Sequence, residues 1–257
     1  MHHAHIDKFA YQDSAIHRLD ARIKFIAAVA YSLVVISLPK TSLSLVLCSL
    51  VGPFAVLVIA EIPLKFILRQ MIIVSPFIVM LALTSIFYDR TEVVKPFGPF
   101  KITTTVGVLR CISIVLKFAV TITTLMALIC TTKFNLLLTA MNKLGMPRLL
   151  TIELGLLYRY IFVLIDKAQH ILRARAIRKL RNLGFKRELK ISGAMAGSLF
   201  LSSLETSSRV NMAMDARGFD GQFRCISQLK IGRGDYVFIT AFVSYLIGLY
   251  FIGTFLV

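Results

Sequence analysis

The stretch 149-LLTIELGLLYRYIFVLI-165 decides the fold of this chain. It is apolar and nearly long enough to cross a bilayer, which takes about 20 residues of α-helix. It also contains Glu153 and Arg159, and each such charge costs about 2.5 to 3.5 kcal/mol at the centre of an inserted helix. We therefore predict that residues 149–165 form a helix that does not span the bilayer.

The distribution of charge supports this assignment. If residues 149–165 crossed a membrane, the basic stretch 167–233 would lie on the outer side. If they do not cross, and the N-terminus is cytoplasmic, the basic residues gather inside, as membrane proteins prefer. The outer loops then hold only four of the 30 basic residues, Lys40, Arg90, Lys95 and Lys101.

The composition sets the class of protein. Of 257 residues, 57% are hydrophobic, and the mean hydropathy is +0.77, which is more apolar surface than a soluble domain of this length can bury. We predict an all-α, multi-pass integral protein of the cell membrane with a cytoplasmic N-terminus. Its five expected spans are Ile23–Leu38, Thr41–Ala60, Met71–Tyr88 after the polar patch 61–70, a segment within Thr103–Cys130 after a turn at Pro96–Pro99, and Tyr236–Val257.

These spans divide the chain into three parts. Residues 1–130 hold four spans, 131–235 form a cytoplasmic or interfacial helical region, and 236–257 form the last span. The middle region should contain two long helices, Leu149–Leu183 and Gly193–Arg217. The second is crowded with small residues, which permit close approach of another helix. Gly184 and Gly218 are expected to end the two helices in the left-handed conformation.

The sequence lacks the motifs of enzymes and nucleotide-binding proteins. It contains no GxxxxGK[ST], no GxGxxG after a strand, no GxSxG and no HExxH. None of its four cysteines pairs at a metal-ligand spacing. A basic excess in so apolar a chain favours contact with anionic lipid rather than nucleic acid. We predict a non-enzymatic protein that binds no cofactor of its own and no nucleic acid.

A similar tripeptide ends each long helix, as Ala174-Arg175-Ala176 and Ala216-Arg217-Gly218. Small neighbours let a helix end enter a groove, and the guanidinium fork can pair there with a carboxylate. The pattern therefore predicts docking to acidic pockets of a partner. A plainer interpretation is an arginine that stabilises the negative end of a helix, worth about 0.3 to 1 kcal/mol.

These motifs and the N-terminal runs 6-IDKFA-10 and 14-SAIHRLDARIK-24 carry a family resemblance. Two arginine tripeptides roughly forty residues apart, after four spans and before a last one, resemble the T components (EcfT type) of energy-coupling factor (ECF) transporters. The N-terminal runs resemble the CbiQ/NikQ branch, which serves cobalt and nickel. The resemblance covers essentially the whole chain.

The resemblance implies a transmembrane coupling subunit of an ATP-driven cobalt or nickel importer. Two cytoplasmic ABC-type ATPase subunits would receive the tripeptides, with Arg175 and Arg217 as docking residues. Their motion would pass through both helices to a substrate-binding membrane subunit of CbiM/NikM type. A small accessory membrane subunit and membrane lipids are further implied partners, and ATP and Co²⁺ or Ni²⁺ would bind to partner chains. Ala176 departs from the commoner Gly or Ser, but it is also small.

Three other functions stay open at this point. A T component for vitamin uptake is distinguished here by the N-terminal run rather than by any pocket, and the substrate-binding subunit that copurifies would decide between the two. A secondary transporter or channel should show inverted repeats and broken midplane helices, and we find no such repeat. A membrane scaffold would use its basic region only to bind anionic lipid.

A few polar residues outside the tripeptides could also have a function. The amine, backbone amides and imidazole in Met1-His2-His3 could wrap a square-planar Ni²⁺ or Cu²⁺, although a solvated tail is the simpler interpretation. Lys117 and Arg110 fall inside the fourth span, where charges often mark a functional site. We expect them to snorkel or to pair within a subunit contact.

Overall fold

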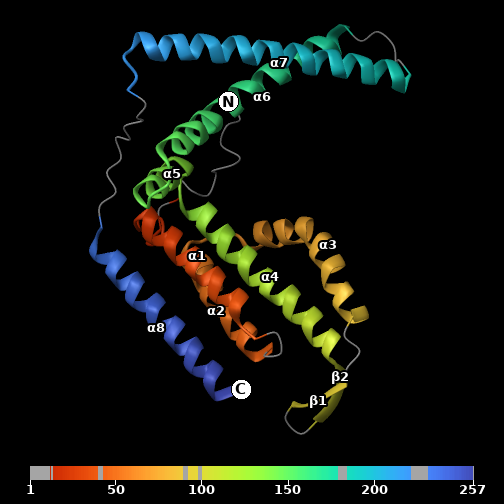
Figure 1. The fold of residues 1–257 in the computed structure, drawn as a ribbon, viewed down its shortest axis with the longest axis vertical. Coiled ribbons are helices and arrows are strands. Elements are labelled where there is room, and N and C mark those ends of the chain that lie inside the picture. Colours follow the sequence, from red (N-terminus) through yellow and green to blue (C-terminus); the bar gives the residue numbers. More distant parts are fainter. Residues whose placement is uncertain are drawn as a thin grey trace. The chain divides into compact units, whose positions relative to one another are not determined.

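The computed structural model describes most of the chain as helix. The described residues are 12, 14–39, 43–88, 92–97, 100–178, 184–220 and 231–256. Within them lie eight helices and two strands, in the order shown in Figure 1. The chain divides into two compact units, Met1–Ala140 with Ser227–Val257, and Met141–Ile226. The predicted division at residues 130 and 235 stays a prediction.

Each of the five predicted spans corresponds to one helix of the first unit. These helices are α1 Ala21–Ser37, α2 Leu43–Ile59, α3 Leu64–Tyr88, α4 Val106–Thr131 and α8 Arg233–Leu256. The short helix α5, Phe134–Lys143, crosses the boundary between the units.

Three of these helices are long and apolar enough to cross a membrane. The qualifying segments are Leu64–Ser85, Gly107–Thr131 and Arg233–Phe251. Helices α1 and α2 have 17 residues each, the lower end of the range for a span, so their crossing of the bilayer stays a prediction. The class of a helical membrane protein is confirmed.

The predicted start of the third span is wrong. Helix α3 begins at Leu64, not at Met71, so Lys65 and Arg69 belong to the helix. Long basic side chains can lie along an apolar surface and keep their charges in water, so they need not end a helix. The chain turns just before, at Glu61, which has a positive φ of 56°.

A two-stranded hairpin joins α3 to α4 and adds a small β element to the helical fold. Strand β1, Glu92–Phe97, pairs antiparallel with β2, Phe100–Thr105, with Phe97 opposite Phe100. The strands are rich in Val, Ile and Thr, the β-branched residues that suit a strand. Residues 98 and 99 of the predicted turn Pro96–Pro99 lie outside the described part of the chain, and α4 begins only at Val106.

Helix α4 forms the centre of the first unit. It packs against α1, α2 and α3, while α8 packs against α1 and α2 (Figure 1). One buried cluster joins three of these helices through Tyr31 and Val35 of α1, Val120 of α4 and Leu249 of α8. Where α2 meets α8, a Cβ atom on Gly52 would lie 2.8 Å from the Tyr245 ring, so glycine permits the close approach.

A buried polar junction ties the starts of α1 and α8 together. The Asp235 carboxylate accepts hydrogen bonds from the backbone N–H of Asp20 and of Gly232, both at 2.8 Å. Asp20 in turn caps α1, because its side chain accepts from the N–H of Arg22 at 2.9 Å. The junction thus joins two segments that are 215 residues apart in the chain.

Two lysines satisfy backbone carbonyls at helix ends. Lys24 is 6% exposed, and its Nζ donates to the carbonyl of Thr131, the last residue of α4, at 2.8 Å. Lys117 Nζ donates to the carbonyls of Ile36 and Leu38 at the end of α1, at 3.1 and 2.5 Å. The last carbonyls of a helix have no partner within it, so both ammonium groups act as caps. Lys117 thus bonds to carbonyls of its own chain, and the expected role of Lys117 and Arg110 in a subunit contact stays a prediction.

We expect Asp235→Ala to destabilise the first unit by about 2 to 4 kcal/mol, because the buried N–H of Asp20 and the partly buried N–H of Gly232 lose their acceptor. Thermal unfolding in detergent, followed with a thiol-reactive dye that reports exposure of the buried Cys130, measures this loss. Asp235→Asn keeps one acceptor oxygen and should lose less. If Asp235→Ala unfolds at the wild-type temperature, the junction does not stabilise the fold.

Candidate functional site

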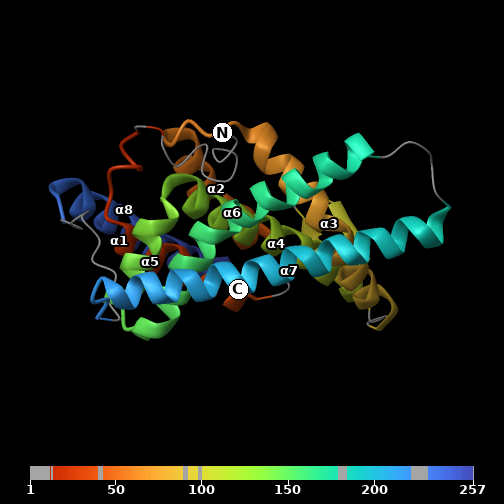
Figure 2. The same cartoon turned by 90° about the horizontal axis from the view of Figure 1, so that it is seen from above.

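The second unit consists mainly of two long helices that carry the arginine tripeptides. Helix α6 spans Arg148–Arg178 and α7 spans Phe185–Ala216. They run in opposite directions and cross (Figures 1 and 2). Neither helix contains a buried residue, and large apolar side chains such as Ile177 and Phe185 are more than 80% exposed. Apolar surface of this extent marks contact with a partner or with lipid.

The structure corrects the start of the second predicted helix, whereas the predicted end of the first lies outside the described residues. Helix α6 is described to Arg178, and residues 179–183 lie outside the described part. Helix α7 begins at Phe185, eight residues before the predicted Gly193. The stretch 185-FKREL-189 contains good helix formers and belongs to α7. The predicted start at Gly193 marks only the point where small residues become frequent within the helix.

The two glycines expected to end the helices behave differently. Gly218 has a φ of +68°, the predicted left-handed conformation after α7. Gly184 has φ −55° and ψ 156° and stands at the N-cap of α7. The prediction that Gly184 ends the first helix in the left-handed conformation is therefore wrong, and its role is to start the second helix, a position where glycine is favoured.

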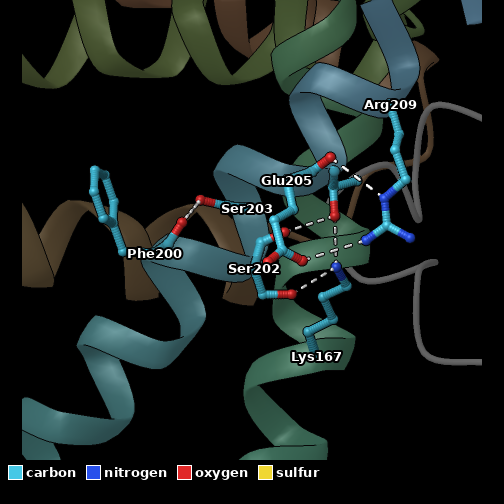
Figure 3. A network of polar contacts seen from close by, with 7 residues as sticks. Lys167, Phe200, Ser202, Ser203, Glu205 and Arg209 are labelled. Carbon is cyan, nitrogen blue, oxygen red and sulfur yellow. Dashed lines mark hydrogen bonds and ion pairs between the residues drawn. The ribbon is translucent and has the colours of Figure 1, made fainter. Parts of the chain in front are cut away.

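A polar clamp holds the two helices together near the middle of α7. The Nζ of Lys167, on α6, donates to Ser202 Oγ at 3.1 Å and to Thr206 Oγ1 at 2.7 Å (Figure 3). Thr206 Oγ1 also donates to the carbonyl of Ser202, one turn earlier. Nearby, Glu205 and Arg209 form an ion pair at 3.5 Å within α7, and both side chains are 71% exposed. Of the two sets of contacts, those of Lys167 link α6 to α7, whereas the ion pair lies within α7.

The first tripeptide lies where the end of α6 meets the start of α7. Arg175 forms an ion pair with Glu188, and their side chains are 23% and 26% exposed. Its Nη1 also lies 3.5 Å from Ser192 Oγ. Ala174 and Ala176 are both exposed, so the small neighbours face outward while the guanidinium is partly enclosed.

The second tripeptide is open. Arg217 is the C-cap residue of α7, its backbone N–H bonds to the carbonyl of Met214 at 3.1 Å, and its side chain is exposed. It forms no ion pair with any residue that the structure describes. The two tripeptides, alike in sequence, are therefore unlike in their surroundings.

The small residues of α7 form an outward surface. Gly193, Ala194, Ala196, Gly197 and Ser198 are all exposed. A Cβ atom added to Gly193 or Gly197 would meet nothing within 4 Å. Packing within this chain thus gives no reason for glycine in the middle of a helix, where it is less favourable than alanine by about 1 kcal/mol.

An apolar cavity lies elsewhere, inside the first unit. Its volume is about 350 Å³, and its walls come from α1, α2, α4 and α8, with Lys24, Tyr31 and Tyr245 among the few polar residues. A wall with a cation and apolar side chains suits a hydrocarbon rather than a divalent metal ion.

No three His, Cys, Asp or Glu side chains of the described residues could hold a metal, and His2 and His3 lie outside them.

The family model and several curated relatives indicate the same family for this chain. The family model described as CbiQ, cobalt transport protein, matches residues 12–227. An uncharacterized protein of Methanocaldococcus jannaschii is 26% identical over 91% of this chain and 81% of its own length. The energy-coupling factor transporter transmembrane protein EcfT of Leuconostoc gelidum is 27% identical over 100% and 99%. A putative ABC transporter ATP-binding protein of Bifidobacterium longum is 26% identical over 91% of this chain but only 31% of its own length.

We expect Lys167→Met to loosen the contact between α6 and α7, because it removes two hydrogen bonds to a charged group, worth about 1 to 2 kcal/mol at a half-exposed site. Amide hydrogen exchange of residues 199–210 should become faster. Arg209→Met serves as the control, since its ion pair stays within α7. Unchanged exchange in Lys167→Met would show that the clamp does not hold the helices together.

Proposed function

Because the chain belongs to the family of CbiQ cobalt transport proteins and is the transmembrane component of an ECF transporter, we propose that it couples ATP hydrolysis on partner subunits to import of cobalt or nickel. The chain itself is a non-catalytic subunit. The observation that carries the proposal is the pair of long, exposed helices that end in Ala174-Arg175-Ala176 and Ala216-Arg217-Gly218.

The two tripeptides are the proposed docking sites for two ABC-type ATPase subunits. At each, an arginine lies among small residues at the end of a helix more than 30 residues long, so a partner groove can close around it. A guanidinium fork binds a carboxylate in a bidentate pair. The relative from Bifidobacterium longum supports an ATPase partner, since a protein named as ATP-binding contains a stretch similar to nearly this whole chain.

Motion of the ATPases would then reach the membrane through α6 and α7. When ATP draws the two ATPases together and hydrolysis lets them part, each carries one helix end with it. The contacts between the helices include the Lys167 clamp and the ion pair of Arg175, which are polar and partly solvated. Such contacts exchange partners at a smaller cost than a packed apolar core, and this suits helices that must move past each other.

The outward surface of small residues on α7 is the proposed contact with the substrate-binding membrane subunit. Gly193 and Gly197 leave open space that another helix can fill closely. Cobalt or nickel as cargo is supported by the description of the matching family and by the N-terminal runs 6–10 and 14–24. A cytoplasmic N-terminus and second unit are supported by the gathering of basic residues.

The double variant Arg175→Ala, Arg217→Ala should lose its ATPase subunits, because an acidic pocket left without its arginine costs on the order of 3 to 5 kcal/mol if buried. The measurement is a detergent pull-down with the native partners, scored for bound ATPase and ATP turnover. The matched control is Arg178→Ala, Arg187→Ala, which removes two exposed arginines of the same helices. Equal losses in both variants would favour a scaffold that only binds anionic lipid, and the absence of any ATPase from the wild-type pull-down would contradict the proposal.

Gly197→Leu should leave the chain as stable as the wild type or slightly more so, since leucine favours helix and meets open space. Uptake of Co²⁺ or Ni²⁺ into vesicles that hold the whole complex should fall at least tenfold, and the substrate-binding subunit should no longer copurify. Lys190→Leu, at an exposed position of the same helix, is the control. Normal uptake by Gly197→Leu would move the subunit contact to another surface.

A further inference from the structure

The ion pair between Arg175 and Glu188 places a carboxylate of this chain on a proposed docking arginine. Glu188 belongs to the first turn of α7, and Arg175 to the last turn of α6. The same guanidinium also lies near Ser192 Oγ and, at 4.0 Å, near Met195 Sδ. Three side chains of α7 therefore surround the group that a partner would have to bind.

The second docking arginine has no such companion. Arg217 is exposed and forms no ion pair with the residues that the structure describes. A partner carboxylate can reach Arg217 directly, whereas at Arg175 it must first displace Glu188. Since the flanking residues of the two arginines are alike, the charged group that distinguishes their described surroundings is Glu188.

The surroundings of the Arg175–Glu188 ion pair allow it to open. Glu188 lies at the positive end of the α7 dipole, and Lys186 and Arg187 precede it directly, so its charge stays stabilised when Arg175 leaves. Arg175 lies in the last turn of α6, where the dipole favours a cation. Both side chains are about one quarter exposed, so water can replace either partner during exchange.

We propose that Glu188 is an intramolecular competitor for the first docking site, so that an ATPase subunit engages Arg217 first and Arg175 only after the Glu188 ion pair has opened. The inference rests on the proposed function, because it assumes that an ATPase carboxylate binds both arginines. It makes the two docking sites unequal in affinity and gives their engagement an order.

The experiment measures binding of the purified ATPase subunits, with a non-hydrolysable ATP analogue, to the full chain in lipid nanodiscs. In an Arg217→Ala background, where docking depends on Arg175, Glu188→Gln should tighten binding about three- to tenfold, because the competing charge is gone. In an Arg175→Ala background the same change should have no effect. Glu205→Gln, which breaks an ion pair confined to α7, is the matched control in both backgrounds.

A second measurement uses the chain alone. Modification of single arginines by phenylglyoxal, read by mass spectrometry, should be slower at Arg175 than at Arg217, and Glu188→Gln should accelerate it at Arg175 only. Equal rates at both arginines of the wild type would overturn the inference, as would weaker ATPase binding by Glu188→Gln, which would make Glu188 a residue that positions Arg175. If the modification rates are as expected but the wild type binds no ATPase, the proposed function fails, and the docking order fails with it.

Discussion

The first unit depends on a carboxylate that is taken out of water and fully engaged. Asp235 is 3% exposed and accepts hydrogen bonds from Asp20 and Gly232. A buried carboxylate is costly unless it is hydrogen-bonded and compensated, so the segments around it must hold their places. Lys24 contributes the compensating charge and binds the end of α4. Three helix ends are thereby fixed at one point, and the apolar contacts farther along α1, α4 and α8 follow from that alignment.

The second unit, in contrast, is held together without buried side chains. Its two helices bury no residue and meet through side chains that remain partly in water. A core of packed apolar side chains has one preferred arrangement, whereas ammonium, guanidinium and hydroxyl groups can exchange partners or bind water. One chain therefore combines a unit anchored by buried contacts with a pair of helices whose contacts can exchange, and this is consistent with the proposed transmission of motion through α6 and α7.

The sequence alone predicted the features that depend on local composition. Runs of apolar residues located all five helices of the first unit, and the arginine tripeptides were evident because each is contiguous. The start of α3 was missed because Lys65 and Arg69 fall in the polar patch 61–70, although such side chains can lie along a helix. The hairpin was missed because its Val, Ile and Thr residues adjoin the hydrophobic run of α4. The contacts of Lys167 and of Arg175 could not be predicted, since they depend on how α6 and α7 pair across 13 to 39 residues of sequence.

The hydrogen bond between Asp20 and Asp235 has a consequence for biosynthesis. A ribosome releases the start of α1 long before it makes the residue that satisfies it, 215 positions later. Until then, α1 and α2 have an uncovered surface where α8 will pack. Packing of the first unit is therefore complete only after α8 has been made. A polypeptide that stops before α8 keeps both arginine tripeptides but leaves that surface of α1 and α2 without its partner helix.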